Sequence, residues 1–171
     1  MGYLKATIDL ALTFDPNSDG VDCYVDASLG MNTIDGHSTT GFLIFMFGCP
    51  VIWRAKKQGH VALSSAEAEF VAMSAACREL ASLRMMCEGI LGVKVVPTIH
   101  EDSKPALRLA EVDDSTTLKH LVKVSYLYVR EEYKNGNIEL CWVGTDDQIA
   151  DIFTKPLAVK KFVQFRSLFM N

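Results

Sequence analysis

The order of secondary-structure elements in this sequence predicts an α/β domain in which helices pack on a mixed β-sheet. Three β-rich stretches come first and form the pattern of a meander, at residues 21–27, 39–47 and 51–55. A long helix is expected over 66–88, and strands at 93–100 and 138–143 then alternate with further helices. A meander followed by alternating helix and strand favours a sheet with both antiparallel and parallel neighbours.

Each strand has its own signature. Residues 21–27 alternate in polarity, whereas 39–47 is a nearly continuous apolar run, which predicts burial on both faces. The third strand leads into a basic loop at 56–59. Pro97 is a poor ladder partner, so the fourth strand is expected to join the sheet only after it.

The later helices are predicted from their ends. Ser103 and Pro105 are a cap and a first-turn proline for a short helix, and a longer helix is expected over 118–133. Thr145 and Gln148 have the spacing of a capping box, which predicts a helix with Asp151 in its second turn. A further amphipathic helix is expected over 159–169.

Composition limits the class of protein. The chain has 171 residues, of which 49% are hydrophobic, so one domain with a full core is expected over residues 20–171, entered by an appendage at 1–19. The five cysteines are scattered, which indicates reduced, buried thiols in a cytosolic or nuclear protein. No signal peptide or apolar run long enough to cross a bilayer is present, so no membrane partner is expected. The net charge of -4 argues weakly against nucleic acid unless acids gather around divalent cations.

The stretch SSAEAEF at 64–70 places two carboxylates at the start of the long helix. Ser64 and Glu67 have capping-box spacing, which gives Glu67 a structural role. Glu69 has no such role and lies beside small apolar residues, where a carboxylate is costly unless it is paired or binds a cation. We therefore favour Glu69 over Glu67 as the functional acid, although the two could exchange roles.

Three further acids occupy comparable positions. Asp26 and Asp102 lie at the ends of predicted strands, and Asp151 lies early in a predicted helix. Sites in α/β proteins are built at such strand ends and loops. Each acid could instead be a turn former, a helix cap or a favourable charge at a helix start. If the four carboxylates converge, their repulsion requires divalent cations, and Mg²⁺ prefers such oxygen ligands. Two ions could then assist hydrolysis of a phosphodiester.

The chain resembles the ribonuclease H domain of copia-type retrotransposon polyproteins. The matching segments cover nearly the whole chain, and the most specific are LSSAEAEF at 63–70 and QIADIFTKPL at 148–157. Others are YVDAS at 24–28, HSTTGFLIF at 37–45, VIWRAKKQ at 51–58, HEDSKPALRLA at 100–110, LKH at 118–120 and YVRE at 128–131. Residues 3–14 resemble the end of the reverse transcriptase connection, which identifies 1–19 as a tether.

This resemblance implies a ribonuclease H-like fold, a five-stranded mixed sheet flanked by helices. It also implies cleavage of the RNA strand of RNA/DNA hybrids during reverse transcription, with two Mg²⁺ or Mn²⁺ ions. The family's catalytic and metal-binding acids fall on Asp26, Glu69, Asp102 and Asp151. The implied partners are the hybrid and the reverse transcriptase domain of the same polyprotein, in a virus-like particle in the cytoplasm or in the nucleus. The isolated domain is expected to be monomeric.

The chain departs from the family pattern at three places. Ser28 and Leu29 stand where the family has a second acid and a Trp, and Ser103 follows Asp102 where the family usually has Asn. The loop at 144–148 is short and has no His, so the residue that assists product release in many ribonucleases H has no counterpart there. These losses leave a second hypothesis open, a domesticated or catalytically weak module that binds hybrid or protein without cleaving. A third is that the isolated domain is inactive without its reverse transcriptase.

Several polar residues could contact nucleic acid, or could form only a solvated surface. They are Arg54, Lys56, Lys57, Gln58, Ser103, Lys119 and His120. The two tryptophans and the methionines Met73, Met85 and Met86 are expected to fill the core.

Overall fold

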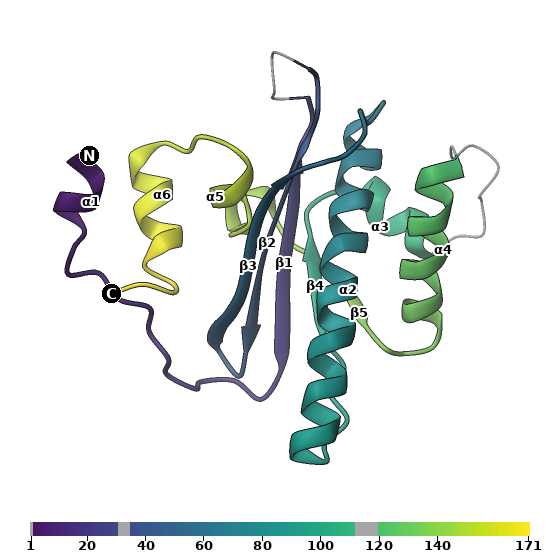
Figure 1. Ribbon diagram of the computed structural model, residues 1–171, viewed down its shortest axis with the longest axis horizontal. Helices are drawn as coiled ribbons and strands as arrows, with labels where there is room; N and C mark the ends of the chain where they lie inside the picture. The colour runs from purple at the N-terminus through teal and green to yellow at the C-terminus, as the bar shows by residue number, and fades with distance from the viewer. Residues whose placement is uncertain (1, 31–34, 112–119) are drawn as a thin grey trace.

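The computed structural model describes residues 2–30, 35–111 and 120–171, and the side chains of this last segment from residue 127 onward. A five-stranded sheet forms the middle layer, with strand order β3-β2-β1-β4-β5 (Figure 1). The strands are β1 Val21–Ser28, β2 Thr39–Met46, β3 Cys49–Lys57, β4 Thr98–Glu101 and β5 Glu139–Trp142. β1, β2 and β3 pair antiparallel, whereas β4 is parallel to both β1 and β5. The predicted mixed sheet is therefore confirmed.

Helices cover both faces of this sheet. On one face lies the long helix α2 (Ser65–Leu91), against which α3 (Lys104–Glu111) and α4 (His120–Lys134) pack. On the other face lie α5 (Asp151–Thr154) and α6 (Val159–Arg166), as Figure 1 shows. Among the described helices, none combines the length and apolar character needed to cross a bilayer.

The strand β2 is buried on both faces, as its apolar run predicts. Phe42 and Ile44 join the core beneath α2, and Leu43 and Phe45 join a second core with Phe165 of α6. Successive side chains of a strand point to opposite faces, so one apolar strand serves both layers. The sheet is held from both sides, and this fixes the strand ends where the acids lie.

The fourth strand begins at Thr98, directly after Pro97, as predicted. It lies between β1 and β5, and the amide of Glu139 donates a 2.9 Å hydrogen bond to the carbonyl of Pro97. Proline lacks an amide hydrogen but keeps its acceptor, so it can start a central strand although it cannot continue one.

The first residues pair with the end of the chain. The helix α1 (Gly2–Ala6) is followed by an isolated antiparallel bridge between Leu12 and Met170. Tyr3 meets Phe162 edge to face, with ring centroids 5.9 Å apart. The assignment of residues 1–19 to a reverse transcriptase tether stays a prediction.

Some core predictions were wrong. Trp53 and Trp142 are about half exposed, because they lie on the two edge strands β3 and β5 of the sheet. Met73 is buried, but Met85 and Met86 are exposed on the last turns of α2. The five cysteines are free; four are buried and Cys141, on the edge strand β5, is exposed.

Candidate metal centre

Asp26 sits near the end of the central strand β1. Its side chain is 1% exposed, and its partner in the ladder with β2 is Gly41. A Cβ at Gly41 would lie 2.5 Å from Cγ2 of Thr154 and 2.9 Å from Cβ of Phe153. The missing side chain therefore lets α5 approach the sheet, where the hydroxyl of Thr154 donates to Oδ2 of Asp26.

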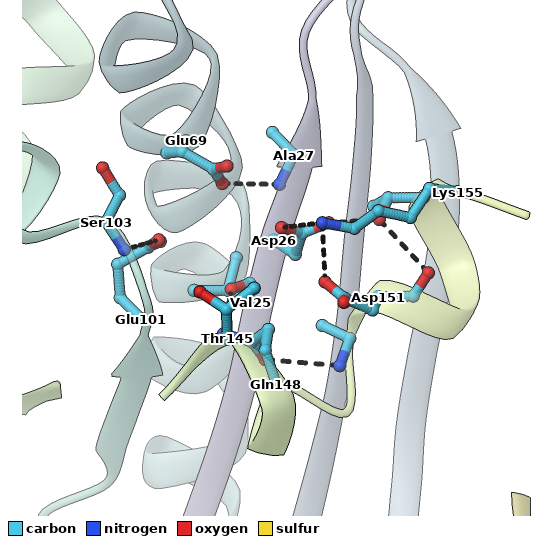
Figure 2. Close-up of polar contacts among 12 residues, drawn as sticks. Val25, Asp26, Ala27, Glu69, Glu101, Ser103, Thr145, Gln148, Asp151 and Lys155 are labelled. Atoms are coloured by element: carbon cyan, nitrogen blue, oxygen red, sulfur yellow. Dashed lines mark hydrogen bonds and ion pairs between the residues drawn. The ribbon is translucent and has the colours of Figure 1, made fainter. Parts of the chain in front are cut away.

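Glu69 reaches the same place from α2. Ser64 caps this helix by accepting from the amide of Glu67, 3.2 Å away, and Glu67 accepts from the amide of Leu63 at 2.9 Å. Glu67 thus takes the structural role that its spacing predicts. Glu69 turns inward instead, is 7% exposed, and accepts from the amide of Ala27 at 2.5 Å (Figure 2).

Asp102 follows β4, which runs parallel to β1 and brings this acid beside Asp26. Its carbonyl accepts from the indole nitrogen of Trp142 at 3.1 Å, and Ser103 caps α3 by accepting from the amide of Ala106 at 3.3 Å. One carboxylate oxygen from each of Asp26, Glu69 and Asp102 lies within 4.8 Å of the other two. Acids separated by many residues in the sequence therefore gather at one point.

Asp151 arrives by a route that the sequence did not predict. Thr145–Asp147 is a 3₁₀ turn without a side-chain cap, so Thr145 and Gln148 do not form the expected capping box. Gln148 is fully buried and donates to the carbonyls of Val25 and His100, at 2.9 and 3.3 Å. Asp151 consequently starts α5, not the second turn of a longer helix, and is 2% exposed.

Two lysines bind Asp151. The ammonium of Lys155 lies 2.8 Å from Oδ1 of Asp151 and 3.4 Å from Oδ1 of Asp26, so it connects the two acids (Figure 2). Lys161 of α6 lies 3.4 Å from Oδ2 of Asp151 and 3.0 Å from the carbonyl of Thr145. Asp151 therefore meets Asp26 through a cation, and it is not part of the three-acid cluster.

The cluster is electrostatically costly without a cation. Burial, together with the charges of Glu101, Asp26 and Asp102, raises the pKa of Glu69 to about 10, against the hydrogen bond from Ala27. Burial also raises the pKa of Asp26, although Thr154 and Lys155 oppose that rise. Desolvation disfavours the charged form of an acid and like charges reinforce the effect. A bound cation would relieve both.

Glu101 is a fifth acid that the sequence reasoning missed. It is fully buried directly before Asp102, and its Oε1 accepts from the amide of Ser103 at 3.0 Å. Its Oε2 has no hydrogen-bond partner among the described residues. Burial raises the pKa of Glu101 well above its ordinary value, and the charges of Asp102 and Asp26 add to that rise. The alternation of β4, which buries Ile99 and Glu101, was the available signal.

These residues fit a hard divalent cation. The cluster offers only carboxylate oxygens, which Mg²⁺ and Mn²⁺ prefer, and two of its three acids are buried. A bound cation would also favour the ionised form of Glu101, whose Oε2 has no hydrogen-bond partner among the described residues. Asp26, Glu69 and Asp102 would hold such an ion.

Comparison with known proteins identifies the architecture. No protein-family model matches. The chain is 31% identical over 169 residues to a Retrovirus-related Pol polyprotein from transposon RE2 of Arabidopsis thaliana, which covers 95% of the chain and 11% of the polyprotein. It is 30% identical over 156 residues to the polyprotein from transposon RE1 of the same plant, covering 88% of the chain and 10% of that polyprotein.

Solved structures show the same fold. The N-terminal RNase H domain of rv2228c from Mycobacterium tuberculosis superposes with a TM-score of 0.55 at 15% identity, covering 88% of this chain and 98% of that one. LC11-RNase H1 in complex with RNA/DNA hybrid gives a TM-score of 0.56 at 16% identity, covering 78% and 93%. This chain is a homologue of copia-type Pol polyproteins. It has a ribonuclease H fold. It spans about a tenth of the length of these curated relatives.

On this ribonuclease H fold, the basic residues beside the site differ in availability. Arg54 pairs with Glu79 at 2.8 Å and Lys57 pairs with Asp35, yet each of these lysine and arginine side chains is more than two-fifths exposed. With Lys56 and Arg78 they line a pocket of about 160 Å³ between β3 and α2. Arg78 was not among the predicted contacts.

The structure corrects the prediction that Gln58 contacts nucleic acid. Gln58 is 5% exposed, and its amide nitrogen donates inward to Thr40 and to the carbonyl of Ala68, at 3.1 and 2.9 Å. The amide nitrogen is therefore not available to nucleic acid, and Gln58 braces β2 against α2. Lys119 and the side chain of His120 lie outside the described part of the chain.

Proposed function

We propose that this chain hydrolyses the RNA strand of RNA/DNA hybrids endonucleolytically, with divalent ions, as the ribonuclease H domain of a retrotransposon polyprotein. The observation that carries this proposal is the convergence of Asp26, Glu69 and Asp102, each with a carboxylate oxygen within 4.8 Å of the other two. Carboxylates from β1, from α2 and from the residue after β4 have no structural reason to meet at such a cost, unless a cation is bound there.

Each acid has a definable task. Asp26, Glu69 and Asp102 would hold one ion, and Asp26 with Asp151 would hold a second. Bound Mg²⁺ or Mn²⁺ ions activate water and stabilise the charge that develops on a phosphodiester under attack. Two neighbouring side chains position these acids. Gln148 connects the strands to α5, and Thr154 fixes a carboxylate oxygen of Asp26 by a hydrogen bond.

The basic pocket suggests how the hybrid is held. The pocket is lined by Arg54, Lys56, Lys57 and Arg78, together with the buried Gln58 that directly follows β3. Phosphate contacts fix the register of a nucleic acid without reading its sequence. This arrangement supports cleavage without sequence choice. Two proteins of similar structure, LC11-RNase H1 and a foamy viral protease-reverse transcriptase, were solved in complex with RNA/DNA hybrid.

The test is cleavage of a labelled hybrid in Mg²⁺ by the Asp26→Asn variant. The amide keeps an acceptor for Thr154 but loses the charge, so cleavage should fall about a hundredfold or more. Asp19→Asn, at an exposed position, is the matched control and should cleave normally. Near-normal cleavage by Asp26→Asn in a folded protein would refute the assignment.

A binding module that does not cleave is the second candidate. Ser28 offers no carboxylate at the end of β1, and Lys155 already compensates Asp26 and Asp151. Binding of the labelled hybrid without cleavage, in Mn²⁺ as well as Mg²⁺, would favour this candidate. Restoration of cleavage on fusion to the reverse transcriptase domain would instead indicate that the domain needs its partner.

A further inference from the structure

Lys155 joins two acids of the site, Asp26 and Asp151. Its ammonium is 2.8 Å from Asp151 and 3.4 Å from Asp26, and Figure 2 shows its nitrogen between them. Both carboxylates are almost fully buried, whereas the lysine is one-third exposed. The lysine therefore reaches in from the rim of the site, and its flexible four-carbon stem would allow the ammonium to withdraw toward solvent.

The local fold holds this lysine in place. Lys155 ends α5, and its backbone amide donates to the carbonyl of Asp151 at 3.2 Å. Its backbone is extended at this C-cap position, and its side chain turns back to Asp151, four residues earlier. Thr154, the residue before it, donates to Asp26. One short helix and its C-cap residue thus supply an acid, a hydroxyl and a cation to the same point.

The other half of the site has no such compensation. The structure gives no ion pair from a lysine, arginine or histidine to Glu69 or Asp102 in the described segments. An ammonium is a single positive charge at almost the place where an ion held by Asp26 and Asp151 would lie. Two cations repel strongly at contact distance in a poorly solvated site, so they cannot share it.

We propose that Lys155 is a resident cation that excludes a divalent ion from the position between Asp26 and Asp151 until it withdraws. The free protein then takes one divalent ion at Asp26, Glu69 and Asp102, and a second only when Lys155 leaves the two carboxylates. A substrate phosphate offers the displaced ammonium another anion, which couples the second ion to hybrid binding. This inference rests on the proposed function and makes Lys155 a positioning residue.

The test counts Mn²⁺ ions on the full chain without nucleic acid, by calorimetric titration and by the electron paramagnetic resonance signal of free Mn²⁺. The unaltered chain should bind one ion, with any second far weaker. Lys155→Met should bind two ions. The second should bind at least about tenfold more tightly than in the unaltered chain, because it no longer has to displace the hydrogen bonds between the Lys155 ammonium and the two carboxylates. Lys160→Met, an exposed lysine of α6, should behave like the unaltered chain.

Lys155→Arg keeps the charge and should still bind a single ion. Two ions of equal affinity on the unaltered chain, or an unchanged count in Lys155→Met, would overturn the proposal. These readings do not depend on cleavage. The proposed function can fail while this inference holds. In that case the ion counts would be as predicted, and Asp26→Asn would bind fewer ions, although the unaltered chain does not cleave the hybrid.

A second measurement needs no substitution. The reactivity of Lys155 toward an amine-acylating reagent can be followed by peptide mass spectrometry. With one equivalent of Mn²⁺ the lysine should remain protected, and at concentrations that load a second ion its labelling rate should rise several-fold. A second ion that binds without changing the labelling of Lys155 would contradict the displacement. Lys160 provides the internal reference.

Discussion

The side-chain amide of Gln148 donates a 2.9 Å hydrogen bond to the carbonyl of Val25, directly before Asp26. The same nitrogen lies 3.3 Å from the carbonyl of His100, two residues before Asp102. Its oxygen accepts from the amide of Ala150, which precedes Asp151. One buried side chain thus sets the spacing of three chain segments that each carry an acid of the site.

Gln148→Leu should disturb the site without removing any of its acids. It leaves buried carbonyls unpaired, which should cost about 1–3 kcal/mol of unfolding free energy, and it releases the segments that carry Asp26, Asp102 and Asp151 from one another. We therefore expect weaker Mn²⁺ binding, measured by titration, together with a lower midpoint in thermal unfolding. Gln164→Leu changes an exposed glutamine of α6 in the same way and should leave both unchanged. Full Mn²⁺ affinity in Gln148→Leu would show that the spacing of Asp26 and Asp102 is set by other contacts.

Gly41→Ala tests the approach of α5 to the sheet. The new methyl would clash with Thr154 and Phe153, so α5 must move away and carry Asp151 and Lys155 with it. We expect loss of hybrid cleavage and a stability loss of about 1–3 kcal/mol from overpacking. Gly89→Ala in α2 meets nothing within 4 Å and should be neutral or stabilising by about 0.5–1 kcal/mol. An active, stable Gly41→Ala would mean that α5 does not need this close contact.

The sequence predicts this fold well where structure follows from local pattern. The apolar run of β2 is long enough to predict burial on both faces of the sheet. Pro97 marks the start of β4 because a residue without an amide hydrogen cannot donate a ladder hydrogen bond in any sequence context. Glu69 could be separated from Glu67 because a helix cap is itself local. Convergence of Asp26, Glu69 and Asp102 needed the sheet order, which the resemblance supplied.

What the sequence did not predict depends on partners far along the chain. Thr145 and Gln148 match a capping box, but Gln148 finds stronger partners in the carbonyls of Val25 and His100, some fifty or more residues earlier. The role of Lys155 likewise depends on Asp26, which reaches it only in the folded sheet. No spacing rule in a single sequence carries that information.

The stability of the metal-free protein should fall as the pH rises. Because burial raises the pKa of Glu69 to about 10, the folded protein keeps this proton, whereas the unfolded chain releases it near pH 4.5. The folded state therefore binds more protons between these values, and the free energy of unfolding decreases across that window. Thermal unfolding in EDTA at pH 5.5 and 8.5 should show the decrease, and Glu69→Gln should reduce it.

Divalent ions should reverse this dependence, because they bind the deprotonated carboxylates and their affinity rises with pH. Added Mg²⁺ should therefore stabilise the protein more at pH 8.5 than at pH 5.5. Glu88→Gln, an exposed glutamate of α2, should retain the pH dependence of the unaltered chain. Equal slopes for Glu69→Gln and the unaltered chain would mean that Glu69 is not the group that titrates.

Glu101 should lower the stability of the metal-free protein and raise its affinity for divalent ions. Glu101→Gln keeps the acceptor for the amide of Ser103 and removes a fully buried carboxylate beside Asp102. In EDTA at pH 8 the variant should gain on the order of 1–3 kcal/mol in unfolding free energy, measured by urea denaturation. Its Mn²⁺ affinity should drop several-fold, because less negative charge faces the ion. Glu111→Gln, exposed at the end of α3, should change neither quantity. Destabilisation of the metal-free protein by Glu101→Gln would instead mean that this carboxylate has a compensating partner and is not simply repelled by its neighbours.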